Sequence, residues 1–325
     1  MSKPYTHLTE EERDRLSVFK AQGRTLREIA ALIGRDASTL SRELRRNAPP
    51  IHQGYYLPHK AQERADVRKA VGHQRARLRD PRLRAYARRM LRRGWSPERI
   101  AGRWQLLGKG RISHEAIYQW IYAQAPELIP CLVRARRKRL RRGHSNKHQA
   151  SHIPSRTPLS QRPERVERRA EPGHWEGDTI VSRQSRSALG LLVERKSRFA
   201  RLRKLQAREA TAMRVAINRA LARYPKHVRR SITYDNGSEN VQHRQVNARL
   251  GTVSYFCEPM HSWEKGSVEN AAGLVRRHLP KKTDFAMVSL DHVKKIERWL
   301  NGLPRKCLGF QTAAEVFRQS VALTG

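Results

Sequence analysis

The order of secondary-structure signals in the second half of the chain restricts the folds that it can adopt. Between residues 170 and 206, three short runs bounded by polar turns are typical of strands: 174–182, 188–194 and 199–205. The pattern then alternates between helix-like segments (207–224, 239–250 and 266–279) and strand-like segments (231–234 and 252–257). Three sequential strands followed by alternating helices and strands predict a mixed α/β sheet with helices on its faces.

This element order is that of a ribonuclease-H-like domain with a mixed five-stranded sheet, which we expect over residues 170–325 with additional C-terminal helices. Three carboxylates stand out in it. Asp178 lies in the first strand, Asp235 ends the fourth, and Glu269 lies on a later helix, with thirty-three residues between Asp235 and Glu269. The first and fourth strands of such a sheet are neighbours. The two aspartates can therefore share a divalent ion, and Glu269 can complete a second site.

The chemistry explains why these residue types recur in this pattern. Mg²⁺ takes oxygen ligands and keeps several waters, and two such ions about 3.5–4 Å apart stabilise the attacking and leaving oxygens of an in-line phosphoryl displacement. No covalent enzyme intermediate is needed, so the same site can hydrolyse a DNA strand first and transfer it afterwards. The sequence therefore predicts that Asp178, Asp235 and Glu269 are the catalytic and metal-binding residues.

Each of these residues also has a simpler interpretation. The sequence Asp235-Asn236-Gly237 is a strong turn signal, although a helix and not a partner strand is expected after it. Asp178 alone fits a surface strand residue, and Glu269 alone fits a solvated helix charge. The combination of the three residues favours the catalytic interpretation.

The first fifty residues are typical of a helix-turn-helix domain. Thr9 with Glu12 and Thr25 with Glu28 form two capping boxes, and Gly34 ends the second helix. A third helix is expected from Asp36 to Asn47, with small and apolar residues facing inward. Its outward face is polar and cationic, which is typical of a DNA-recognition helix. The predicted DNA-binding residues are Ser38, Thr39, Ser41, Arg42, Arg45 and Arg46. The alternative is an ordinary three-helix bundle with a solvated basic face.

The remaining segments divide the chain into four regions: a helix-turn-helix domain (1–50), a second helical region (51–133), a basic flexible linker (134–169) and the catalytic domain (170–325). Ser96-Pro97 and Ser113 begin two helices of the second region, which could be a second DNA-reading pair. We expect its three tryptophans in the protein core: Trp95, Trp104 and Trp120. Residues 134–142 hold seven cationic side chains in nine, and a segment of this composition can follow a phosphate backbone.

The charge of the chain favours a polyanionic partner. Lys and Arg number 68 against 29 acidic residues, a net charge of +39, and residues 1–169 hold 40 of the basic but only 15 of the acidic residues. Three scattered cysteines with no Cys-x-x-Cys give no reason to expect structural zinc or a disulfide framework. No run of 18 apolar residues occurs, so we expect a soluble, cytoplasmic protein.

Longer motifs resemble one known family. The stretches 173–180 and 234–239 resemble the first and second aspartate motifs of the IS30 family of insertion-sequence transposases, and 261–281 resembles its glutamate motif, with the same spacing. Residues 304–310, the segment 8–46 and 95–98 are also similar. The resemblance covers nearly the whole chain. The sequence departs from the family pattern at Ala271-Ala272, where a polar residue and Asn are expected, and at Cys307.

The resemblance implies a DDE transposase with a retroviral-integrase-like core, an enzyme with DNA endonuclease and strand-transfer activity. Its expected partners are double-stranded DNA (the terminal inverted repeats of its element, and target DNA) and further copies of itself when two ends are brought together. It implies Mg²⁺, with Mn²⁺ as a substitute and no zinc, and work on a bacterial nucleoid. No membrane or small-molecule substrate is expected. Asn270 and Arg276 are possible accessory residues, and His261 could approach the scissile phosphate or be structural.

Three other functions remain open from the sequence. A ribosomal or histone-like packing protein would explain the charge, and a DNA-binding regulator would also explain the helix-turn-helix pattern. Neither explains the carboxylates. A nuclease that cleaves without joining fits the carboxylates equally well, and only the family resemblance speaks against it. An inactive, decayed copy is a further alternative, against which the intact triad argues.

Overall fold

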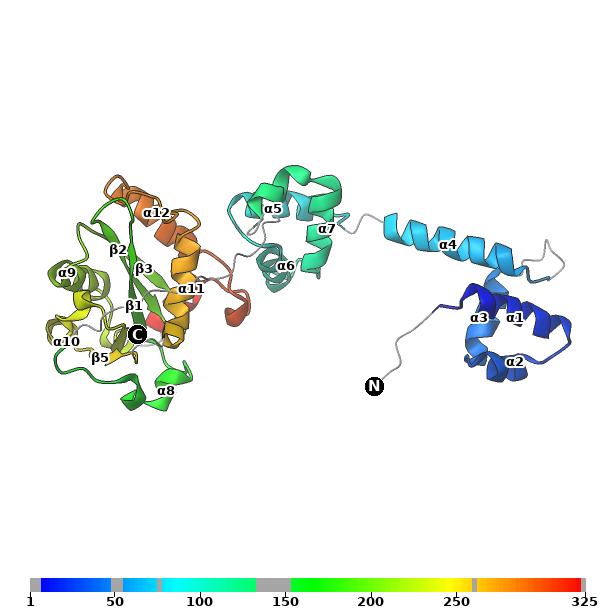
Figure 1. The fold of residues 1–325 in the computed structure, drawn as a ribbon, viewed down its shortest axis with the longest axis horizontal. Helices are drawn as coiled ribbons and strands as arrows, with labels where there is room; N and C mark the ends of the chain where they lie inside the picture. Colours follow the sequence, from blue (N-terminus) through cyan, green and yellow to red (C-terminus); the bar gives the residue numbers. More distant parts are fainter. Residues whose placement is uncertain (1–6, 48–54, 75–77, 133–152, 259–261, 323–325) are drawn as a thin grey trace. The chain divides into compact units, whose positions relative to one another are not determined.

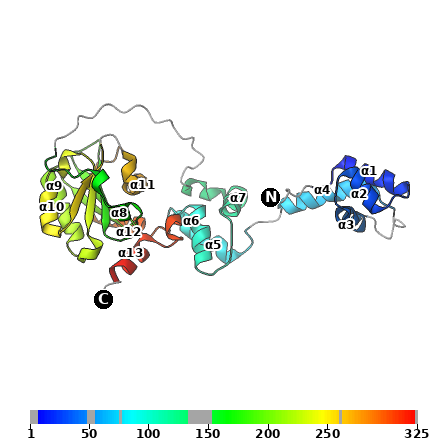
Figure 2. The same cartoon turned by 90° about the horizontal axis from the view of Figure 1, so that it is seen from below.

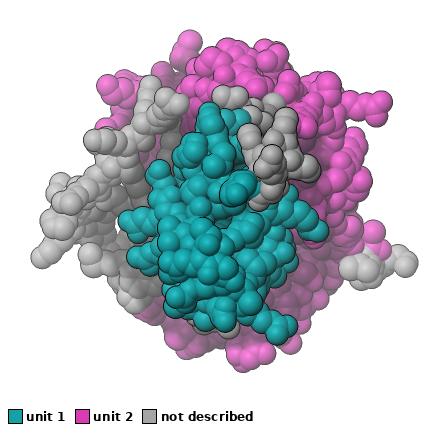
Figure 3. Space-filling model, turned by 90° about the vertical axis from the view of Figure 1, so that its right-hand side faces the viewer, with its two compact units in different colours: residues 1–77 teal, residues 78–325 magenta. Residues whose placement is uncertain are grey.

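A computed structural model describes residues 7–47, 55–74, 78–132, 153–258 and 262–322 of the chain. The chain forms two compact units, residues 1–77 and residues 78–325, which Figure 3 colours separately. The basic cluster 134–142 and His261 lie outside the described residues. Among the described helices, none is long and apolar enough to cross a membrane.

The first unit contains the predicted three helices and a fourth, longer one (Figure 1): α1 (Glu10–Ala21), α2 (Leu26–Ile33), α3 (Ala37–Asn47) and α4 (Pro58–Gln74). Both predicted capping boxes are present, at the starts of α1 and α2. Gly34 ends α2 with φ 74°, a left-handed conformation that glycine adopts without steric cost.

The core of this unit goes on past residue 50, where we expected the helix-turn-helix domain to end. Leu16, Ile29 and Leu40 come from the first three helices. Tyr56, which precedes α4, and Ala61 of α4 pack into the same cluster. The first unit is therefore completed by residues that we assigned to the second helical region.

The second helical region is formed by α5 (Pro81–Arg92), α6 (Pro97–Leu106), α7 (His114–Gln124) and a 3₁₀ helix (Pro126–Cys131). Ser96 and Ser113 cap α6 and α7, as the sequence predicts. Trp104 and Trp120 are buried in the core of this region. Trp95 is half-buried, and it packs against both this core and the core beside α11 (Gly266–Val275) and α12 (Leu290–Asn301). The prediction that the tryptophans are core residues is thus confirmed for Trp104 and Trp120.

The C-terminal part of the chain packs against α6. Arg103 of α6 forms an ion pair with Glu315, with 2.6 Å between Nη2 and Oε1, and the ring of Phe310 lies against Gly102. A Cβ atom at Gly102 would be 2.3 Å from Cγ of Phe310. Glycine is therefore required on this face of α6 for the close approach of the ring.

We expect Gly102→Ala to lower the free energy of unfolding by about 1–2 kcal/mol. Overpacking of the ring costs about 1–3 kcal/mol, which is more than the stability gained from the better helix propensity of alanine. Urea denaturation measures the change. The double variant Gly102→Ala, Phe310→Ala removes the clash and should lose less stability than the sum of the two single variants. Simple additivity of the single changes would show that the ring does not limit this site.

The second half of the predicted flexible linker is not a linker. Residues 153–169 contain a 3₁₀ helix (Leu159–Gln161) and α8 (Glu164–Glu167). Ile153 and Val166 are buried, and the backbone N–H of Phe256 donates to the carbonyl of Thr157 at 2.9 Å. The segment is rich in Pro and Arg, so its composition did not indicate that Ile153 and Val166 fix it to the domain that begins at residue 170.

The domain that we expected from residue 170 contains the predicted mixed five-stranded sheet, formed by β1 (His174–Val181), β2 (Ala188–Glu194), β3 (Ala200–Leu205), β4 (Ser231–Tyr234) and β5 (Val253–Phe256). The strand order is β3-β2-β1-β4-β5. The first three strands are antiparallel, and β1, β4 and β5 are parallel. This confirms the ribonuclease-H-like order and makes β1 and β4 neighbours.

Helices cover both faces of this sheet (Figures 1 and 2): α9 (Ala210–Leu221) and α10 (His243–Leu250) on one side, α11 (Gly266–Val275) and α12 (Leu290–Asn301) on the other. Each side has its own apolar core. The last helix, α13 (Ala313–Ala322), contributes Phe317 to the core beside α9.

Candidate active site

The sheet topology brings Asp178 and Asp235 to the same place. The parallel register of β1 and β4 pairs Glu176 with Thr233. Each aspartate lies two residues further along its own strand direction: Asp178 within β1, beside the point where β4 ends, and Asp235 directly after β4. Parallel β-strands end at the same edge of a sheet, which is where α/β proteins place their ligands.

A buried lysine joins the two aspartates. Nζ of Lys265 lies 3.3 Å from Oδ1 of Asp178 and 3.5 Å from Oδ2 of Asp235. The same ammonium donates to the carbonyl of Gly177 at 3.0 Å, and its side chain is 7% exposed. Burial opposes the charge on Lys265, but Asp178 and Asp235 outweigh it and raise the pKa of the lysine. Burial, together with the charge of Asp235, raises the pKa of Asp178 against the opposing effect of Lys265.

The loop after β4 fixes the carboxylate of Asp235. Nδ2 of Asn240 donates to Oδ1 of Asp235 at 2.8 Å, and the backbone N–H of Gly237 donates to the same oxygen at 3.3 Å. Asn236 donates through Nδ2 to the carbonyl of Cys257 at 2.8 Å, which ties the loop to the end of β5. A short 3₁₀ helix (Ser238–Asn240) and then α10 follow this turn. The turn therefore does not connect the two strands of a hairpin, in agreement with the expectation of a helix after it.

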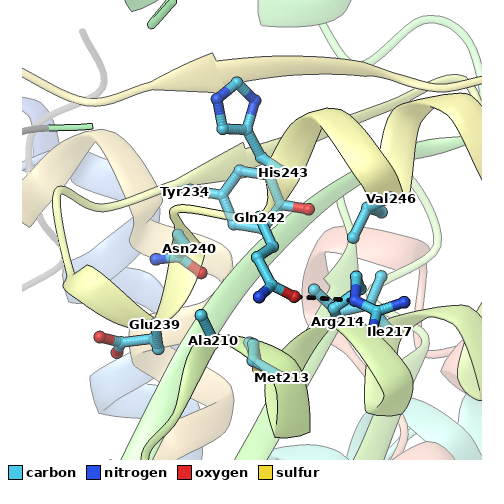
Figure 4. A pocket seen from close by; sticks show the side chains of 10 residues that line it. All are labelled: Ala210, Met213, Arg214, Ile217, Tyr234, Glu239, Asn240, Gln242, His243 and Val246. Atoms are coloured by element: carbon cyan, nitrogen blue, oxygen red, sulfur yellow. Dashed lines mark hydrogen bonds between the residues drawn. The ribbon is translucent and has the colours of Figure 1, made fainter. Parts of the chain in front are cut away.

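A small cavity lies behind this loop, between α9 and α10 (Figure 4). Glu239 is buried there and accepts from Nε of Arg208 at 2.8 Å. His243 interacts through Nε2 with the carbonyl of Pro154 at 3.1 Å, so part of the segment before α8 supports the same loop. The cavity is too narrow for a substrate, and its lining stabilises the position of Asp235.

Glu176 is a buried carboxylate that our sequence analysis did not single out. Its Oε1 accepts from Nη1 of Arg195 at 2.8 Å, and its Oε2 accepts from the backbone N–H groups of Ser267 and Val268 at 3.0 and 2.9 Å. These N–H groups are in the first turn of α11, where the helix has free donors and a positive dipole end. Glu176 thus fixes the helix that carries Glu269 to the strand that carries Asp178.

The remaining predicted residues lie on α11, which packs against β1 and β2. Glu269 and Asn270 are exposed. Arg276 donates through Nη2 to the carbonyl of Val181 at 2.6 Å, so it ties the end of α11 to the end of β1. In the part of the chain that the structure describes, no three His, Cys, Asp or Glu side chains are grouped closely enough to hold a metal ion. Asp178 and Asp235 are brought together, and Glu269 is not in one group with them.

The predicted recognition face is available on α3. Five of its six residues are exposed and Thr39 is half-buried; the exposed ones are Ser38, Ser41, Arg42, Arg45 and Arg46. On the opposite face Leu40 and Glu43 are buried. Glu43 accepts from Nε of Arg13 at 2.8 Å, a buried ion pair between α3 and α1 that the sequence pattern did not reveal.

Two families of domains match parts of the chain. Residues 4–47 match a family described as a helix-turn-helix domain, and residues 168–262 match a family described as an integrase core domain. The first match covers α1 to α3. The second covers Asp178 and Asp235 and ends before Glu269.

Three bacterial proteins are similar over almost the full chain. The transposase for insertion sequence element IS4351 of Bacteroides fragilis is 37% identical, over 97% of this chain and 96% of that protein. The transposase for element IS1086 of Cupriavidus metallidurans is also 37% identical, over 98% of this chain and 96% of that protein. The transposase InsI for element IS30A of Escherichia coli is 33% identical, over 98% and 85%.

Proposed function

The chain belongs to the IS30 family of insertion-sequence transposases, and we propose that it cuts and joins DNA ends at a divalent-metal site formed by Asp178, Asp235 and Glu269. Its helix-turn-helix domain and integrase-type core imply DNA binding and transposition.

The convergence of Asp178 and Asp235 on one ammonium is the observation that carries this proposal. Two carboxylates whose oxygens lie 3.3 and 3.5 Å from the same Nζ form a place that accepts positive charge. Their donor set consists of oxygen only, which Mg²⁺ and Mn²⁺ prefer and which gives no reason for zinc. When bound there, divalent ions stabilise the attacking and leaving oxygens at phosphorus.

The protein's own groups position the reaction. Asn240 and the N–H of Gly237 orient the Asp235 carboxylate, and Glu176 and Arg276 fix the two ends of α11 to β1. In the displacement, a water or a 3′-hydroxyl oxygen forms the new bond to phosphorus while the bond to the leaving oxygen breaks. The exposed position of Glu269 lets this residue face a DNA strand that approaches α11.

Incubation of the full chain with labelled element ends, a plasmid target and Mg²⁺ tests the function. Joined products are expected, with Mn²⁺ as a working substitute. Cleaved ends that are never joined would identify a nuclease, and binding without cleavage would identify a regulator or a decayed copy. Activity in EDTA, or stoichiometric zinc in protein purified without added metal, would overturn the metal assignment.

We propose that α3 reads the terminal inverted repeats from the major groove. Its outward side chains are polar or cationic, and the inward face is committed to the core of the first unit. Early residues of a recognition helix reach base edges more often, and later arginines reach phosphates. The residues proposed to set sequence preference are Ser38, Thr39, Ser41 and Arg42.

We expect Arg42→Ala to weaken binding to element ends by roughly 1–3 kcal/mol and binding to unrelated DNA much less. Arg45→Ala and Arg46→Ala should weaken binding to all DNA alike and reduce the salt dependence by about one unit per lost phosphate contact. Fluorescence anisotropy on both DNA types at several salt concentrations measures this. Arg15→Ala, at an exposed position of α1, controls for the change of net charge. If Arg42→Ala weakens binding to both DNA types equally, Arg42 does not recognise the DNA sequence. The next candidates for recognition would then be α6 and α7.

We also propose that several copies of the chain bring two element ends together, since one helix-turn-helix domain reads one site. A chain of net charge +39 that acts on an insertion sequence works on the bacterial nucleoid, in the cytoplasm. Sedimentation of the protein with paired element ends measures the assembly. A single copy bound to two ends would contradict it.

A further inference from the structure

Lys265 stands out because its position is not explained by packing alone. It is the last residue of a 3₁₀ helix (Ser262–Lys265), directly before α11, and its side chain is almost completely buried. A buried ammonium without compensation is costly, and lysine is rarely fully buried unless it is paired. Here the compensation comes from Asp178, Asp235 and the carbonyl of Gly177.

We propose that Lys265 is a built-in competitor of the metal ion: its ammonium holds the two aspartates together and must leave them before a divalent cation can bind. This inference rests on the proposed metal site of Asp178 and Asp235. It assigns Lys265 a regulatory part in metal loading, separate from the DDE residues.

The ammonium lies where an ion shared by the two aspartates would bind. A divalent ion that binds both aspartates takes carboxylate oxygens at about 2.0–2.1 Å for Mg²⁺. The Lys265 ammonium already lies within 3.5 Å of one oxygen of each carboxylate. Two cations cannot occupy the space between the same oxygens, because they repel each other and overlap. An ion bound between these two oxygens must therefore displace the ammonium from at least one aspartate.

The ammonium also has a positive effect on the site. Two carboxylates at neighbouring strand ends repel each other, and a cation between them relieves that repulsion. Lys265 supplies such a cation from the chain itself, so the strand ends can fold with both aspartates charged. The exchange takes place next to Gly266, where the helix that carries Glu269 begins.

Mn²⁺ titration of the full chain without DNA tests the inference, with free Mn²⁺ measured by electron paramagnetic resonance. Lys265→Met keeps the length of the side chain and removes the charge. We expect it to bind Mn²⁺ about tenfold more tightly than the wild type, which corresponds to about 1.4 kcal/mol. In EDTA its thermal unfolding midpoint should be lower than that of the wild type, and Mn²⁺ should raise this midpoint by more than it raises the wild-type value.

Three further variants separate the possible outcomes. Lys265→Arg keeps the positive charge and should bind Mn²⁺ no more tightly than the wild type. Lys196→Met removes an ammonium that donates to the carbonyl of Ala170 and should leave Mn²⁺ affinity unchanged. If Lys265→Met does not fold in EDTA, Lys265→Gln refolded with Mn²⁺ gives the same affinity comparison.

Unchanged or weaker Mn²⁺ binding by both neutral Lys265 variants would overturn the competition. Asp178→Asn distinguishes this from failure of the metal site itself. If Asp178→Asn binds Mn²⁺ as well as the wild type, the proposed metal site is wrong. If Asp178→Asn loses binding while Lys265→Met equals the wild type, only the role of Lys265 is wrong.

Discussion

Asp178→Asn, Asp235→Asn and Glu269→Gln should each abolish cleavage and joining while the protein still binds element ends. Each change removes a charged ligand with little change in volume. Loss of several kcal/mol of metal-based stabilisation corresponds to a rate lower by roughly a thousandfold or more. Single-turnover cleavage of labelled ends measures the rate, and anisotropy measures the binding.

Asp291→Asn is the matched control, because Asp291 is an exposed carboxylate on α12 that pairs only loosely with Lys294, at 3.4 Å. It should cleave and join like the wild type. Joining at nearly the wild-type rate by one of the three variants would remove that residue from the catalytic set. This outcome matters most for Glu269, which the structure does not group with the two aspartates.

Glu176→Gln should destabilise the protein by roughly 3–5 kcal/mol, the usual cost of breaking a buried ion pair from one side. Arg195, which is 1% exposed, would then have only the exposed Glu167, at 3.3 Å, as a charged partner. The first turn of α11 would also lose a charged acceptor for two N–H groups. Equilibrium unfolding in urea measures the loss.

The surface pair of Lys306 and Glu98 provides the comparison for this prediction. Its two atoms are also 2.8 Å apart, but the lysine side chain is 74% exposed and the glutamate side chain 45%. Glu98→Gln should therefore change stability by only about 0–1 kcal/mol. Similar losses for Glu98→Gln and Glu176→Gln would show that burial does not strengthen the Glu176 contacts.

The sequence predicted the fold well where a local pattern determines the structure. The capping boxes at Thr9 and Thr25 depend on residues three positions apart, and the strand runs depend on alternation over a few residues. Boundaries were less accurate where tertiary contacts compete. The helix expected from residue 239 begins at His243, since Asn240 instead directs its side chain to Asp235.

The site could be predicted only in part, for a related reason. Asp178 and Asp235 were identified from their positions at strands that the topology makes neighbours. The partners of Glu176 lie 19 and 91–92 residues away, and Lys265 is 87 residues from Asp178. No spacing rule within one helix or strand connects residues so far apart, so their contacts emerge only from the folded sheet.

The contact between α6 and the C-terminal part of the chain bears on how the protein is synthesised. Translation that terminates before Phe310 yields a chain that lacks the ring packed against Gly102 and lacks Glu315, the ion-pair partner of Arg103. Such a chain also lacks Phe317 in the core beside α9. The elements that carry Asp178, Asp235 and Glu269 would already be translated, but the core around them would be incomplete. A chain that ends before Phe310 should therefore be less stable than the full chain, which limited proteolysis of the two would measure.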